Sequence, residues 1–133
     1  MKQHSVLLIC IAVFLVIVVG LVSAVSVLSG DSGLRSGSLQ RITTDSMAPT
    51  FESGDWIWCA DVADPAELRV GDIITYWTVI NGDRVLNTHR IVGIFDAGSY
   101  LIFETKGDNN VNADPLNVHE SDIVGVYRFK LPF

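Results

Sequence analysis

Two patterns of hydrophobic residues divide the chain. From Ser5 to Gly30 no residue is charged, and residues 6–22 are almost entirely aliphatic or aromatic. A membrane-spanning helix needs about 20 apolar residues, so this pattern predicts an N-terminal transmembrane anchor over residues 1–30. A cleaved signal peptide is the alternative, because small residues follow the apolar run. The apolar region of such a peptide typically has only about 7–15 residues, however, and the length of the run favours the anchor.

The second pattern begins after a stretch rich in Gly and Ser. Residues 31–40 have no hydrophobic periodicity, which predicts a flexible linker. Beyond it, short apolar and β-branched runs recur between turn signals. Strands are expected at Trp56–Cys59, Ile73–Val79, Val85–Phe95, Tyr100–Glu104 and Ile123–Phe129. So many short strands predict a mainly β domain over residues 41–133, built as a compact antiparallel barrel or coiled sheet.

Turn signals support this arrangement. Asn81 and Gly82 stand between two of the expected strands, and both tolerate the positive φ of a type I′ hairpin turn. Residues 96–98 indicate the next turn. Asp64 precedes Pro65 as a helix cap precedes the first helical position, which predicts one helical turn there.

Charge and cysteine content exclude several kinds of partner. The formal net charge is −6, so a nucleic-acid surface is not expected to attract the domain. Cys10 lies in the expected anchor and Cys59 in the outer domain, so they are not expected to pair, and apolar packing explains both. No Cys/His cluster has the spacing of metal ligands, so neither a metal nor another cofactor is expected. Basic residues flank the apolar run on both sides, so they do not set its orientation.

A serine becomes a nucleophile only when a base removes its proton. No lysine lies between Gln40 and Thr105, which leaves histidine as the candidate base. His4 precedes the apolar run, whereas His89 and His119 follow it. His119 has acidic neighbours and is interpreted as a solvated loop residue, so His89 is the favoured base.

Ser46 is the candidate nucleophile. Pro49 biases Ala48 away from helix and restricts its own φ, so the segment around Ser46 should be a bent loop that exposes this serine. Its peptide N–H can then face an oxyanion. Taken alone, a serine near a proline is usually a turn residue.

Four segments, in order, resemble the type I signal peptidases. Residues 46–50 (SMAPT) resemble their nucleophile box, 71–76 (GDIITY) the strand that follows, and 106–110 (KGDNN) their late acidic box. Residues 88–91 (THRI) fall where the bacterial members carry lysine and the endoplasmic-reticulum-type members carry histidine. The match covers roughly residues 40–130 and resembles the Ser-His branch of the family.

The resemblance implies a role for each matching residue. Ser46 would attack the scissile carbonyl, and His89 would accept and return its proton. Asp114 would orient the imidazole, with Asp108 supporting it from further out or replacing it; an Asx turn is the plainer interpretation of Asp108. The Ser46 N–H and the Thr44 hydroxyl would hold the oxyanion.

The resemblance also implies a substrate and a location. The expected substrates are the signal peptides of secreted preproteins, cut after small residues and bound by β-addition to an edge strand. The lipid bilayer would be a second partner, with the domain on the extracytoplasmic or lumenal side; the sequence does not decide whether further subunits take part. Two alternatives stay open: a non-catalytic membrane-tethered β-domain, and a self-cleaving repressor-type peptidase, which the missing lysine disfavours.

Overall fold

The computed structural model describes Val13 and residues 36–133. The predicted anchor over residues 1–30, apart from Val13, lies outside the described residues, as do Cys10 and half of the predicted linker. Among the described residues, no helix has the length and hydrophobicity needed to cross a membrane.

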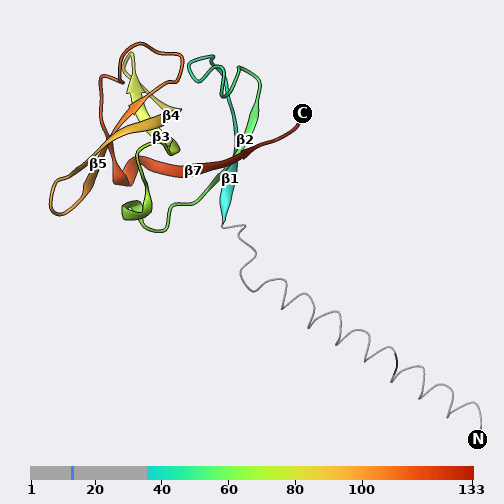
Figure 1. The fold of residues 1–133 in the computed structure, drawn as a ribbon, viewed down its shortest axis with the longest axis horizontal. Helices are drawn as coiled ribbons and strands as arrows, with labels where there is room; N and C mark the ends of the chain where they lie inside the picture. The colour runs from blue at the N-terminus through green and yellow to red at the C-terminus, as the bar shows by residue number, and fades with distance from the viewer. Residues whose placement is uncertain (1–12, 14–35) are drawn as a thin grey trace, which may run out of the picture. The chain divides into compact units, whose positions relative to one another are not determined.

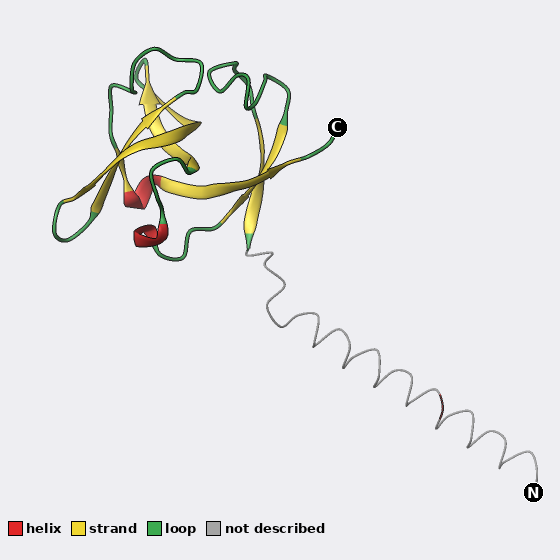
Figure 2. Cartoon of the chain, in the orientation of Figure 1, coloured by secondary structure: helices red, strands yellow, loops and turns green. Residues whose placement is uncertain are grey.

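Residues 36–133 form one sheet of seven strands in the order β1-β2-β7-β3-β4-β5-β6, and every neighbouring pair is antiparallel. The strands are β1 (Gly37–Arg41), β2 (Trp56–Ala60), β3 (Ile73–Ile80), β4 (Asp83–Asp96), β5 (Leu101–Lys106), β6 (Val118–His119) and β7 (Ile123–Lys130). Two short 3₁₀ turns, η1 (Pro65–Glu67) and η2 (Glu120–Asp122), supply the helix of this part of the chain (Figures 1 and 2). The mainly β prediction is confirmed.

The predicted turns lie where the sequence indicated them. Asn81 and Gly82 have φ values of 53° and 88° and join β3 to β4, with Ile80 opposite Asp83. The Asp64 side chain accepts a hydrogen bond from the Ala66 N–H at 2.9 Å and so caps η1. The hairpin matters for function because it aligns β4, which carries His89, along the whole length of β3.

Strand β1 was not predicted, because it begins within the expected linker. Gly37 pairs with Ala60 at the start of the β1–β2 ladder. A Cβ at position 37 would collide with the Cys59 carbonyl oxygen. Glycine is therefore needed there for close strand approach, a requirement that the sequence pattern did not distinguish from flexibility.

Two hydrophobic clusters form the core of the described domain. One cluster consists of Leu68, Ile74, Tyr76, Ile91, Phe103, Val118 and Val126. The other consists of Ile42, Met47, Phe51, Ile57, Cys59 and Ile73, with Tyr127 packed against it. Cys59 is fully buried there, as predicted for an apolar thiol. Because Met47 and Phe51 belong to this second cluster, it anchors the loop that carries Ser46.

Candidate active site

The Ser46 loop, residues 42–51, connects β1 to β2. Met47 and Phe51 are each only 1% exposed and hold the loop against the core. Between them the backbone bends: the Ala48 N–H bonds to the Asp45 carbonyl at 3.0 Å and the Phe51 N–H to the Met47 carbonyl at 3.1 Å. Ser46 immediately precedes the buried Met47 and is half-buried at the surface.

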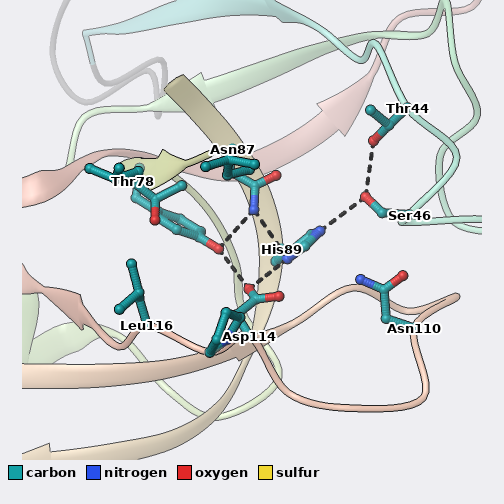
Figure 3. A pocket seen from close by; sticks show the side chains of 12 residues that line it. Thr44, Ser46, Thr78, Asn87, His89, Asn110, Asp114 and Leu116 are labelled. Atoms are coloured by element: carbon teal, nitrogen blue, oxygen red, sulfur yellow. Dashed lines mark hydrogen bonds and ion pairs between the residues drawn. The ribbon is translucent and has the colours of Figure 1, made fainter. Parts of the chain in front are cut away.

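His89 lies between a serine and a carboxylate. Strand β4 places its ring so that Nε2 is 2.9 Å from Ser46 Oγ and Nδ1 is 2.6 Å from Asp114 Oδ2 (Figure 3). The ring is 5% exposed. An ionised carboxylate only accepts hydrogen bonds, so the imidazole donates from Nδ1 and leaves Nε2 to accept the Ser46 proton.

Asp114 comes from the acidic loop, residues 107–117, which joins β5 to β6. Besides His89, its Oδ2 accepts hydrogen bonds from the Tyr76 hydroxyl at 2.8 Å and the Thr105 hydroxyl at 2.7 Å. Burial raises the pKa of the Asp114 carboxyl, but its three hydrogen-bond donors outweigh burial and hold that pKa below its ordinary value. The group facing His89 is therefore an ionised carboxylate at neutral pH.

Asp108 occupies a different position in the same loop. Its two carboxylate oxygens accept from Arg90 Nε at 2.8 Å and Nη2 at 2.7 Å, and Oδ2 also accepts from the Thr50 hydroxyl at 2.6 Å. The hydrogen bond from Arg90 is the main reason that the pKa of Asp108 is lowered. Asp108 thus links β4 to the Ser46 loop, and of the two aspartates it is Asp114 that contacts the imidazole.

The acidic loop also supports the backbone of the serine. The Asn109 N–H bonds to the Ser46 carbonyl at 2.9 Å, and the Asn109 side chain bonds to the Asp45 carbonyl at 3.2 Å. A Cβ on Gly107 would lie 2.6 Å from the Ser46 carbonyl oxygen. The close approach of these two loops, side by side in Figure 1, therefore requires glycine at position 107.

Two hydrogen-bond donors lie next to the Ser46 side chain. The Thr44 hydroxyl is 3.1 Å from Ser46 Oγ and reaches it from a different direction than His89 (Figure 3). Within residues 36–133, the hydrogen bonds do not use the Ser46 N–H. Both groups are therefore able to donate to a negative oxygen that forms beside Ser46.

Two cavities reach Ser46. The larger has a volume of about 330 Å³, and Val79, Ile80, Pro115 and Leu116 give it apolar walls beside the polar residues Ser46, Asn87 and His89. The smaller, about 230 Å³, lies between residues 41–47 and residues 85–88 of β4, with Ile80 also lining it. An apolar cavity with few polar groups is typical of a site that binds a substrate side chain.

A hydroxyl that is hydrogen-bonded to an imidazole, which is in turn hydrogen-bonded to a carboxylate, forms the arrangement that activates a serine nucleophile. Signal peptidase I W of Bacillus subtilis (strain 168) is 37% identical to this chain over 134 residues, which cover 99% of the chain and 69% of that protein. The chain belongs to the signal peptidase I family. It is accordingly a serine protease.

More distant similarity extends to eukaryotic members of the family. The signal peptidase complex catalytic subunit SEC11 of Colletotrichum graminicola is 36% identical over 75 residues, covering 55% of this chain and 41% of that protein. The corresponding sec11 of Neurospora crassa is 39% identical over 75 residues, with the same coverage of 55% and 41%. The match spans about two fifths of the length of each of these two proteins. No protein-family model matches it.

His119, the other histidine of the domain, lies outside the site formed by Ser46, His89 and Asp114. Its Nδ1 accepts a hydrogen bond from the Ser121 N–H at 3.1 Å and caps η2. Its ring centroid is 4.6 Å from that of Tyr100. These local contacts give His119 a structural role, and it lines neither cavity at Ser46.

Three residues of the site were not identified from the sequence. Tyr76 and Thr105 bind Asp114, and Asn87 lies 3.2 Å from His89 Nδ1 through its side-chain nitrogen. A signal existed for Asn87, because it stands two residues before His89 and so shares its face of β4. Tyr76 lies opposite Asn87 in the β3–β4 register, which only the pairing of the strands reveals.

Proposed function

We propose that this protein removes signal peptides from secreted preproteins, with Ser46 as the nucleophile and His89 as its general base. The observation that carries the proposal is the pair of short contacts on the imidazole, 2.9 Å to Ser46 Oγ and 2.6 Å to Asp114 Oδ2. The names of the relatives supply the substrate class. A histidine base assigns the protein to the Ser-His branch of the family.

Each group then has a defined role in the reaction. Ser46 Oγ attacks the scissile carbonyl while His89 Nε2 takes its proton, and Asp114 stabilises the imidazolium that forms. The Ser46 N–H and the Thr44 hydroxyl donate to the oxyanion. His89 next gives its proton to the leaving amine. It then activates the water that hydrolyses the acyl-enzyme, which frees Ser46.

The substrate is proposed to bind as an added strand beside β4. Strand β4 pairs with β5 only from Arg90 onward. Its earlier residues, Asp83–His89, pair with β3 on one edge, and among the described residues no strand pairs with their other edge. The 230 Å³ cavity lies along this segment and ends at Ser46. An extended peptide there would place alternate side chains toward the sheet, with cleavage after small residues.

Membrane attachment follows from the sequence and is part of the proposal. Residues 1–30 would anchor the enzyme in the bilayer, with its domain on the extracytoplasmic or lumenal side. The 16 residues from Gly30 to Ser46 reach at most about 50 Å when extended. The nucleophile would therefore stay close to the membrane-embedded part of a preprotein.

The test is cleavage of one defined preprotein by the purified full chain in detergent, followed by gel electrophoresis. Ser46→Ala and His89→Ala should each abolish product formation while circular dichroism shows that the domain remains folded. Ser53→Ala and His119→Asn are the matched controls: Ser53 is exposed outside the site and asparagine retains the η2 cap, so both should cleave normally. Product from either site variant would refute the proposal.

A further inference from the structure

The Asp114 carboxylate is held by hydroxyl groups from two strands. Tyr76 on β3 is 1% exposed and Thr105 on β5 is fully buried. Their hydroxyl oxygens lie 2.8 Å and 2.7 Å from Asp114 Oδ2, the same oxygen that accepts from His89. In addition, the Asp114 N–H bonds to the Thr105 carbonyl at 2.8 Å. Among the described residues, the donors to the Asp114 side chain therefore all lie on strands.

Counting protons gives the direction of these hydrogen bonds. A hydroxyl has one proton and a carboxylate only accepts, so Tyr76 and Thr105 both donate to Asp114. The Asn87 side chain, 3.1 Å from the Tyr76 oxygen, donates to Tyr76 in turn. The 2.9 Å contact between the Tyr76 and Thr105 oxygens then carries no proton. In this arrangement the protons of both hydroxyls are directed at the Asp114 carboxylate.

Tyr76 is a permanent donor. Burial is the main cause that raises the pKa of its phenol well above the ordinary value, and the nearby charge of Asp114 raises it further. The phenol therefore keeps its proton at any pH at which the enzyme is expected to work. Its donation to Asp114 does not switch off within that range.

We propose that Tyr76 is a positioning residue for catalysis: with Thr105, its hydroxyl keeps the Asp114 carboxylate ionised and directed at His89 Nδ1. The inference rests on the proposed roles of Ser46, His89 and Asp114. Each donor on Oδ2 neutralises part of the negative charge that faces the imidazole. With fewer donors the carboxylate stabilises the imidazolium more strongly, so the acid side of the pH dependence of activity moves to higher pH. The two hydroxyls consequently extend activity toward lower pH.

Tyr76→Phe tests this role, because it retains the ring and removes only the hydroxyl. We expect kcat to fall about tenfold with KM unchanged, because a carboxylate held by fewer donors is less firmly directed at His89 Nδ1. The acid side of the kcat/KM profile should move to higher pH by roughly half a unit. Both are measured from initial rates of the full chain on one preprotein in detergent.

Thr105 provides an independent arm if Tyr76→Phe does not fold. Thr105→Val removes the second donor and should move the acid side in the same direction, whereas Thr105→Ser retains the hydroxyl and should leave it in place. Tyr127→Phe is the matched control, because that ring packs against Phe51 at 4.9 Å, outside the site. It should leave both kcat and the pH profile unchanged.

If the acid side of the kcat/KM profile stays at the same pH in both Tyr76→Phe and Thr105→Val, the inference is overturned, even if kcat falls. A merely structural role would lower the rate without moving the pH profile. Activity in Ser46→Ala or His89→Ala would instead overturn the proposed function. The two failures are therefore distinguishable.

Discussion

At the scale of single residues, the two aspartates of the acidic loop differ in what surrounds them. Asp114 accepts from one imidazole and two hydroxyls, and Asp108 accepts from a guanidinium and one hydroxyl. A carboxylate beside a histidine acts on proton transfer, whereas a carboxylate paired with arginine holds two segments together. The same side chain thus has a different expected role at each position.

Replacing each aspartate separately should reveal this difference. Asp114→Asn removes the charge proposed to stabilise the imidazolium, and we expect kcat to fall by about 10⁴, as for the buried aspartate of other serine protease triads. Asp108→Asn weakens only the link between Arg90 and the Ser46 loop, so its kcat should fall far less while its melting temperature drops. Steady-state rates and thermal unfolding measure both. Equal losses of kcat in the two variants would contradict the assignment.

At the scale of elements, the site depends on two loops that hold each other. The Ser46 loop is fixed to the core by Met47 and Phe51, and its backbone accepts hydrogen bonds from Asn109. Gly107 lets the acidic loop approach closely enough for these bonds to form. Ser46 is therefore placed by a segment that follows it by some 60 residues, since Asn109 and Asp45 are separated by 64 positions.

Gly107→Ala should disturb this contact. The added Cβ would lie 2.6 Å from the Ser46 carbonyl oxygen and 2.7 Å from the Asn110 side-chain nitrogen. Because the clash is with backbone and not with the end of a flexible side chain, it is relieved only if the Ser46 segment shifts, and we expect kcat to fall by about 10². Gly107→Ala combined with Asn110→Ala tests the reason. Restored activity in the double variant would assign the clash to Asn110 rather than to the Ser46 loop.

At the scale of the whole domain, stability should depend on pH through three carboxylates. Hydrogen bonds from the Glu52 backbone N–H and from Lys130 lower the pKa of Asp55, the hydrogen bond from Arg90 lowers the pKa of Asp108, and the donors to Asp114 outweigh burial and lower its pKa. A pKa that is lower in the folded state means that the unfolded chain binds protons first as the pH falls. The stabilisation is therefore complete above the unfolded pKa and is lost as pH drops through the folded pKa.

We therefore expect the melting temperature of the full chain in detergent to be steady near neutral pH and to fall below about pH 4. Circular dichroism at a series of pH values measures this. Asp108→Asn removes one of the three carboxylates, so its melting temperature should start lower and fall less steeply with acid. A wild-type melting temperature that is constant through the acid range would contradict the role of these groups.

Local sequence determined the features that depend on near neighbours. Asn81 and Gly82 predicted the β3–β4 hairpin because few residues adopt their φ values, and alternating apolar residues predicted five strands. Strand β1 was missed because Gly37 and Ser38 have the composition of a flexible segment. Only its partner, the backbone of β2, explains the glycine.

By itself, the sequence limited the candidate site residues to a serine in a bent loop, a histidine in a span that contains no lysine, and two aspartates in one acidic loop. Which aspartate lies beside the imidazole was decided by tertiary structure alone. His89 and Asp114 are 25 positions apart, and His89 and Ser46 are 43 apart, so no local rule relates them. The buried hydroxyls of Tyr76 and Thr105 select Asp114, because a carboxylate is stable in the core only where donors surround it.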